Sequence, residues 1–111
     1  MVTFGSVISS ARKKLNMSQK ELASQITKED NTEISPQYLN DIEHDRRYPP
    51  SDYILQQFSN KLNISLDYLQ YLAGKLPEDI ANAELNPEQV KEVFSAFRTS
   101  LKGKKDENFR G

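Results

Sequence analysis

The sequence of 111 residues contains no cysteine, no tryptophan and one histidine, His44. Without cysteine the chain can form neither disulfides nor thiolate metal sites, which fits a reducing compartment. No cysteine, second histidine or carboxylate stands at ligand spacing from His44, so we expect no metal and no cofactor. The chain also lacks both the run of about 18 apolar residues that a membrane span needs and the pattern of a secretory signal. These absences predict a cytoplasmic protein.

Enzyme signatures are missing as well. The sequence has no G-x-S-x-G, no P-loop and no H-E-x-x-H, and no nucleophile and base stand at a defined spacing. We therefore expect no enzyme. No useful stretch alternates between apolar and polar residues as a strand does, so the sequence predicts an all-α fold. With 36% hydrophobic residues, a chain of this length can bury one modest core.

Net charge is also nearly absent, at −1 for the whole chain. Residues 1–50 carry seven basic and seven acidic side chains, residues 51–101 carry four and seven, and residues 102–111 carry four and two. The charge therefore does not indicate strong, sequence-independent binding to nucleic acid. A few well-placed cations, doubled in a dimer, remain compatible with specific binding.

Apolar residues recur at helical spacing in five segments, followed by a separate sixth. The expected helices are 4–15, 18–28, 35–44, 52–62, 66–73 and 86–102. Ser51, Ser65 and Asn86 are expected caps, and Gly74 is expected to end the fifth helix. We expect a bundle over residues 1–74, a connector and C-terminal helix over 75–102, in which Leu76 and Ile80 can pack, and a disordered tail over 103–111.

Two of these helices begin with clear capping signals. Ser18 and Glu21 form an S-x-x-E capping box, in which each side chain bonds the other residue's backbone N–H. Ser35-Pro36 repeats a start signal, because proline at the first helical position loses no hydrogen bond. Leu39 and Ile42 give the second of the two helices a buried side. Two capped helices, the second with a polar exposed face, predict a helix-turn-helix.

The patterns S-Q-x-E-L-A and S-P-Q-Y-L-x-D-I-E, followed by a basic pair and Pro-Pro, occur here in that order. In this, residues 4–72 resemble the phage repressor/Cro-type (XRE) helix-turn-helix family, which implies a five-helix lambda-repressor-like DNA-binding bundle. The link between the motif helices, from Ala23 to Ser35, is longer than is usual in the family. We expect its extra residues, with the acidic side chains Glu29, Asp30 and Glu33, to form a protruding loop.

The resemblance assigns DNA contacts to polar residues of the motif. Gln37 is the main candidate for reading a base, because a carboxamide can pair with adenine N6 and N7. Gln19 is expected to hold a phosphate, and Arg46 and Arg47 suit phosphate oxygens. Asp41 is expected to accept from a cytosine or to pair with one of the two arginines. The full expected set is Gln19, Lys20, Ser35, Gln37, Tyr38, Asn40, Asp41, Arg46 and Arg47.

Three residues near the motif have alternative or structural interpretations. Tyr38 can contact DNA or pack against the preceding loop. In the family, the residue at Glu43 ties the helix end to the bundle. The basic run Arg12-Lys13-Lys14 is expected to be a solvated helix end, with phosphate contact as the alternative.

The sixth helix carries an apolar stripe that must be buried somewhere. We expect it to dimerise the chain, although it could pack on its own bundle. The stripe consists of Val90, Val93, Phe94, Phe97 and Leu101.

The sequence as a whole predicts a transcriptional regulator, most simply a homodimeric repressor on an inverted repeat in double-stranded DNA. One alternative is an antitoxin-like or protease-partnered regulator whose C-terminal segment docks a second protein, a toxin or a regulatory protease. Another is a helical adaptor without DNA binding. The operator and the controlled genes are not encoded in any recognisable pattern.

Overall fold

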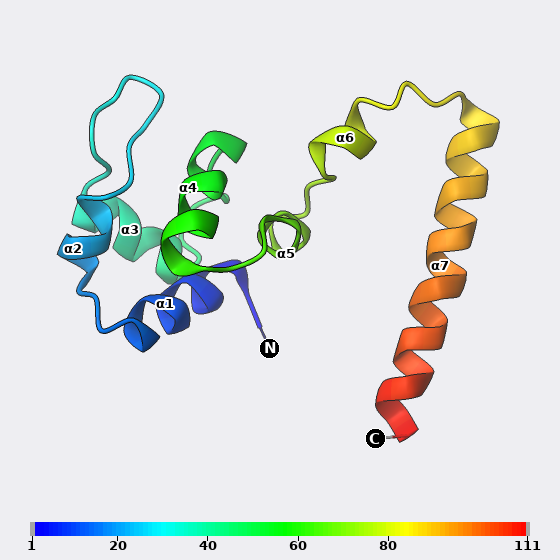
Figure 1. The fold of residues 1–111 in the computed structure, drawn as a ribbon, viewed down its shortest axis with the longest axis horizontal. Helices are drawn as coiled ribbons and strands as arrows, with labels where there is room; N and C mark the ends of the chain where they lie inside the picture. Colours follow the sequence, from blue (N-terminus) through cyan, green and yellow to red (C-terminus); the bar gives the residue numbers. More distant parts are fainter. Residues whose placement is uncertain (1, 111) are drawn as a thin grey trace. The chain divides into compact units, whose positions relative to one another are not determined.

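The computed structural model describes the backbone of residues 2–110 and the side chains of residues 2–105. The described chain is helical and divides into two units, Met1–Pro77 and Glu78–Gly111, each of which is considered by itself. The helices of the first unit and then of the second are coloured along the chain in Figure 1. They are α1 Phe4–Lys14, α2 Gln19–Ala23, α3 Pro36–Glu43, α4 Asp52–Leu62, α5 Leu66–Leu72, α6 Glu78–Ala81 and α7 Pro87–Arg110.

The expected capping residues begin most of these helices. The Ser18 Oγ accepts from the Glu21 N–H at 3.0 Å, and Glu21 Oε1 accepts from the Ser18 N–H at 3.2 Å, so the predicted capping box is confirmed. Ser35 and Ser65 cap α3 and α5 in the expected way. Ser51 occupies the cap position of α4 but makes no side-chain cap bond. Its hydroxyl instead donates to Glu29 Oε1 at 2.8 Å, a partner from the loop between α2 and α3.

That loop explains why α2 is shorter than expected. The helix ends at Ala23 rather than near residue 28, and the chain then forms a small hairpin that extends from the unit (Figure 1). An isolated antiparallel bridge joins Thr27 and Glu33. Ile26 and Ile34 are fully buried at its base. Burial of these two apolar side chains at facing positions stabilises the hairpin more than an extension of α2 would. The predicted protruding loop is confirmed.

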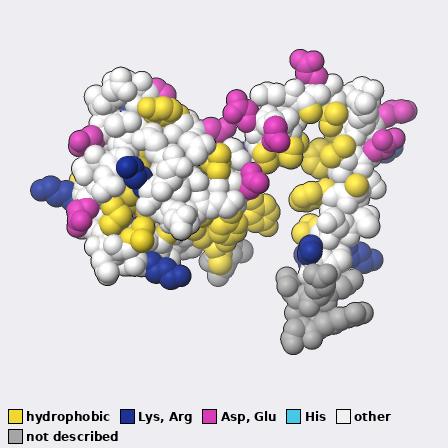
Figure 2. All heavy atoms as spheres, viewed as in Figure 1, with side chains coloured by type: hydrophobic (Ala, Val, Ile, Leu, Met, Phe, Trp, Pro, Cys, Tyr) yellow, Lys and Arg dark blue, Asp and Glu magenta, His cyan; other side chains and the backbone are white. Residues whose placement is uncertain are grey.

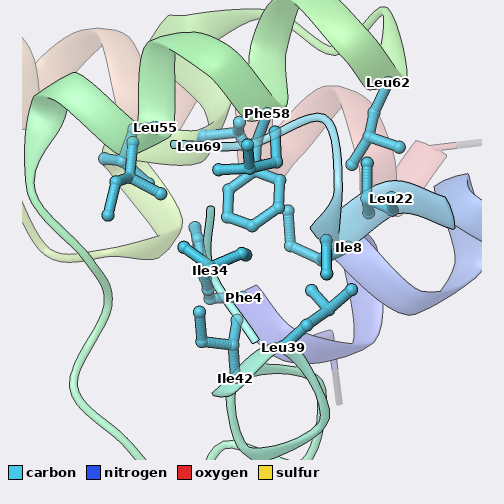
Figure 3. Close-up of a cluster of buried hydrophobic side chains, with 13 residues drawn as sticks. Phe4, Ile8, Leu22, Ile34, Leu39, Ile42, Leu55, Phe58, Leu62 and Leu69 are labelled. Carbon is cyan, nitrogen blue, oxygen red and sulfur yellow. The ribbon is translucent and has the colours of Figure 1, made fainter. Parts of the chain in front are cut away.

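The core of the first unit comes from α1 to α5 and the base of the hairpin. Figure 3 shows Phe58 of α4 among Ile8 of α1, Leu22 of α2 and side chains of α3 and α5. Each of these three side chains is fully buried. The predicted five-helix bundle is therefore confirmed, with every helix supplying at least one apolar side chain to a shared core.

Helices α1 and α3 approach each other closely at Gly5. A Cβ atom at this position would lie 2.4 Å from the backbone oxygen of Ile42 and 2.6 Å from that of Glu43. The Gly5 N–H donates to Asp45 Oδ1 at 2.9 Å, and Thr3 Oγ1 donates to Asp45 Oδ2 at 2.6 Å. The start of α1 is thus held against the end of α3, which requires a residue without a side chain.

The second unit contains α6 and α7, neither of which has a buried residue among its described side chains. Asn86 caps α7 through reciprocal bonds with Gln89, as its sequence predicts. Leu76 and Ile80, through which the connector could pack, are both exposed, and their packing stays a prediction. Residues 78–81 form a short helix within the segment expected to be only a connector.

Helix α7 continues to Arg110, so the disordered tail expected for residues 103–111 is wrong over residues 103–110; Gly111 lies outside the described residues. Extending an existing helix costs far less than starting one, so a single glycine, Gly103, does not end it. Hydrophobic side chains gather along one side of α7 (Figure 2). Within the described residues, no helix has the length and apolar character needed to cross a membrane.

We predict that Gly5→Ala lowers the free energy of unfolding of the first unit by about 1–3 kcal/mol, because the methyl group forces two backbone segments apart. Chemical denaturation followed by circular dichroism measures this difference. Ser10→Ala, at an exposed position of the same helix, is the matched control and should change stability by less than about 0.5 kcal/mol. Equal stability of the two variants would contradict the close-contact argument.

Candidate nucleic-acid interface

Helix α3 separates apolar and polar residues onto two sides. Leu39 and Ile42 lie in the core, and Gln37 is exposed at the first turn. The short helix has Pro36 at its first position and Ser35 Oγ accepting from the Tyr38 N–H at 3.0 Å, so its beginning is firmly defined. The polar side is therefore presented on a rigid element, which is what readout of base edges in a groove requires.

The end of α3 is fixed to the bundle by a buried ion pair. Arg12 Nε and Nη2 donate to Glu43 Oε2 and Oε1 at 2.7 and 3.0 Å, and the two residues are only 8% and 7% exposed. Arg12 Nη1 also donates to the Met17 carbonyl at 2.8 Å. This confirms the bundle-tying role expected for Glu43. For the basic run at the end of α1, the expected solvated helix end is wrong for Arg12, which is buried in this pair, whereas Lys13 and Lys14 are exposed as expected.

The ionisation of this pair follows from its contacts. Burial alone would raise the pKa of Glu43, but hydrogen bonds from Arg12 and Gln19 and the charge of Arg12 outweigh burial, and the pKa is lowered. The hydrogen bond to Glu43 likewise raises the pKa of Arg12 above its ordinary value. Both groups are therefore charged at neutral pH.

Gln19 faces the bundle rather than solvent alone. Its Nε2 donates to Glu43 Oε1 at 3.0 Å and to Asn40 Oδ1 at 3.1 Å. Both amide hydrogens are thus engaged inside the protein, and the expected donation of this amide to a phosphate would require one of these bonds to break. In the structure Gln19 links α2 to α3 and orients the Asn40 side chain. Its DNA contact stays a prediction.

Asp41 is the centre of a second polar cluster, which lies on the exposed side of α3. Gln37 Nε2 donates to Asp41 Oδ1 at 3.0 Å. Arg46 Nη1 lies 3.6 Å from Oδ1, and Arg47 Nε lies 3.7 Å from Oδ2. The expected pairing of Asp41 with an arginine is confirmed and includes both arginines. The Arg47 guanidinium also lies over the Tyr38 ring, 4.7 Å from its centroid.

The remaining expected residues are placed as follows. Tyr38 is half-buried against the core, which supports its packing interpretation and leaves one ring face to Arg47. Lys20 and Ser35 are exposed, at α2 and at the cap of α3. His44 is exposed at the end of α3, with Nδ1 2.8 Å from the Asn40 carbonyl oxygen. The structure brings the α3 face, Arg46 and Arg47 together.

The hairpin that leads into α3 is held at its base. Thr27 N–H donates to Gln57 Oε1 at 2.8 Å, and Gln57 Nε2 donates back to the Thr27 carbonyl at 2.8 Å. These reciprocal bonds tie the hairpin to α4. The acidic side chains Glu29, Asp30 and Glu33 are exposed on it.

Two structural residues were missed by sequence reasoning. Arg12 looked like one of three equivalent cations, and Asp45 had no expected role, although it caps the start of α1 from the loop after α3. Both bridge segments more than thirty residues apart, and no local signal identifies such partners. The helical period alone gives one clue, since Arg12 follows Ile8 by four positions and so lies on the buried side of α1.

These features define a DNA-binding protein with a helix-turn-helix. A family model described as helix-turn-helix matches residues 8–69, more than half of the chain. The chain therefore belongs to the phage repressor/Cro-type (XRE) helix-turn-helix family and is a DNA-binding transcription regulator of this type.

The chain is also similar to one solved structure. This is a chain of the SinR protein/SinI protein complex, with 23% sequence identity and a TM-score of 0.50. The similarity covers 88% of this chain and 99% of that one. At this identity it supports the fold alone. The comparison with curated proteins gives no match.

We predict that Arg12→Met lowers the free energy of unfolding by about 3–5 kcal/mol, because it leaves Glu43 buried without its partner. The double variant Arg12→Met/Glu43→Leu should recover much of this loss, since no unpaired charge remains. Denaturant unfolding of the wild type, both single variants and the double variant measures the coupling. A double variant that is no more stable than Arg12→Met would contradict this explanation.

The pH dependence of the same proteins provides an internal check. A lowered pKa of Glu43 in the folded state stabilises the fold at pH values above the ordinary glutamate pKa, about 4.3. This contribution is lost as the pH falls through the lower folded value, when the carboxylate must be protonated. The wild type should therefore lose more stability between pH 7 and pH 3 than the double variant, which lacks the carboxylate.

Proposed function

We propose that this regulator is a repressor that binds an inverted repeat as a homodimer, with α3 of each copy in the major groove. The observation that carries the proposal is the polar side of α3, where Gln37 and Asn40 lie on the same helix as Asp41, which pairs with Arg46 and Arg47 from the loop after α3. Amides suit base edges and guanidiniums suit phosphates. A repressor acts by occupying its site, which needs no further catalytic or activating element.

The charge of the chain supports a dimer. With a net charge of −1, one copy has few cations to place against phosphates. One α3 of eight residues also reads only a few base pairs. Two copies on successive turns of the duplex double both the phosphate contacts and the sequence read.

The apolar stripe of α7 is the proposed dimer contact. Val90, Val93, Phe94, Phe97 and Leu101 follow one another at helical spacing, and all are exposed, with Phe97 at 57%. Side chains of this size are rarely left together in water, so their exposure within the second unit supports burial against a second copy. The polar residues Glu88, Lys91, Glu92 and Thr99 occupy other sides of the helix.

A protein partner is the second candidate function for the same stripe. The similar solved structure is of a complex between two proteins, SinR and SinI. An antitoxin-like or protease-partnered regulator would use α7 to bind a different chain in place of a second copy. The two functions differ in what α7 contacts, and they share the DNA-binding face of α3.

For DNA binding we predict different effects for two variants. Gln37→Ala should reduce the preference for a selected duplex over a random one by about 1–3 kcal/mol, because one base contact is lost. Arg46→Ala should weaken binding to both duplexes alike and lower the salt dependence by about one ion, because one phosphate contact is lost. Fluorescence anisotropy with both duplexes at several salt concentrations measures these effects.

Lys61→Ala is the control, since this exposed cation lies on α4, away from the proposed interface. It should leave the sequence preference unchanged. The assignment of bases to Gln37 would be wrong if Gln37→Ala and Arg46→Ala gave the same pattern.

For assembly we predict that Phe94→Glu converts the dimer into a monomer, because a charge in an apolar contact must be desolvated without a partner. Sedimentation equilibrium of the full chain measures the mass. Thr99→Glu adds the same charge on the opposite side of α7 and should leave the dimer intact. A wild type that is monomeric alone and gains mass only with a second protein would favour the partner-docking function.

A further inference from the structure

We propose that Asp41 is a specificity-determining residue that acts as an internal substitute for a DNA phosphate. In the free protein it binds the side chains that are proposed to contact DNA. A duplex without a matching base offers no contact to Asp41 that offsets the loss of these interactions. The inference rests on the proposed DNA-binding role of α3 and goes beyond it, because it assigns the discrimination against non-specific DNA to one carboxylate.

The geometry of the cluster carries the first step. Asp41 contacts three side chains at once: Gln37 Nε2 at 3.0 Å, Arg46 Nη1 at 3.6 Å and Arg47 Nε at 3.7 Å. These are the main base-reading candidate and both phosphate-binding candidates. A carboxylate offers guanidiniums the same planar oxygen acceptors as a phosphate does. In the free protein, Asp41 is therefore the anionic partner of the two arginines, and a DNA phosphate must replace it.

The exposure of the cluster argues for a role other than stability. The side chains of Arg46 and Arg47 are 59% and 52% exposed, whereas Asp41 is 21% exposed. Exposed ion pairs with separations of this size contribute little to folding. The bundle is already fixed by the buried Arg12–Glu43 pair, so Asp41 is not needed to hold α3 in place.

The charge of Asp41 changes the binding free energy by different amounts on different DNA sequences. Near any duplex, the carboxylate faces phosphates and repels them, and the arginines must leave it to bind the backbone. On a duplex with a suitably placed cytosine, the carboxylate can accept from the cytosine N4 amino group. The repulsion is then offset only on the matching site, which raises the ratio of specific to non-specific affinity.

Arg47 does not depend on Asp41 alone for its orientation. Its guanidinium lies over the Tyr38 ring at 4.7 Å, a contact that does not involve Asp41. The substitution Asp41→Asn also keeps an oxygen that can accept from Gln37. It therefore removes one negative charge from the face while retaining its shape and most of its contacts.

The test compares wild type, Asp41→Asn and a matched control, Asp67→Asn, as full-length chains. Asp67 is exposed at the start of α5 and loses the same charge away from α3. Anisotropy titrations use a random-sequence duplex and a duplex enriched by selection with the wild type, at four KCl concentrations. Thermal unfolding of each protein verifies that the fold is unchanged.

We expect Asp41→Asn to bind the random duplex roughly five- to tenfold more tightly than the wild type. The slope of log affinity against log salt should steepen by about 0.9 per protomer, because one negative charge no longer offsets the charge of the two arginines at the phosphates. Affinity for the selected duplex should rise less or fall, so discrimination decreases. Asp67→Asn should match the wild type.

Two results would overturn the inference in distinguishable ways. If the wild type enriches no sequence and binds no duplex, the proposed function fails and the inference fails with it. If the wild type binds its selected duplex with preference, but Asp41→Asn has unchanged affinity for the random duplex, the proposed function stands and only the role of Asp41 is rejected.

Discussion

The buried pair of Arg12 and Glu43 is the interaction on which the arrangement of the first unit depends. It connects the end of α1 to the end of α3, and Gln19 joins it from α2. Both charges are almost completely removed from water, so each requires the other. Three helices are thereby fixed at one point, and Gly5 lets α1 and α3 come close enough for it. The contacts that the buried side of α3 makes with α1 and α2 therefore fix the orientation of its exposed side.

The proposed DNA-binding face combines a small positive charge with an internal carboxylate. Arg46 and Arg47 follow α3 directly, but Asp41 pairs with both. A face of this kind cannot rely on attraction to the phosphate backbone, which is the same for every sequence. The proposed recognition by hydrogen bonds to base edges and by the combined contacts of two copies fits such a face. The near-zero net charge is therefore consistent with selective binding.

The long helix of the second unit is explained by local interactions, without a buried core. Helix α7 has a cap formed by Asn86 and Gln89 at its start, and it continues through residues that the sequence suggested were disordered. Its described side chains are all exposed. Local hydrogen bonds and propagation are enough to explain the helix, whereas its apolar stripe has no partner among the described residues of the second unit. The proposed dimer, or the proposed contact with a second protein, would bury this stripe.

The sequence by itself determined where every described helix except α6 starts, because capping side chains and proline act on neighbouring backbone groups. It also determined the family, the core positions and the candidate DNA-binding residues, since these follow from local pattern. Only the tertiary structure decided that Arg12 is buried against Glu43, that Gln19 turns inward and that Ser51 contacts Glu29 instead of capping α4. Each of these side chains had several suitable partners in the sequence. The choice among them depends on which segments the packed core brings within hydrogen-bond distance, and local pattern contains no information about that distance.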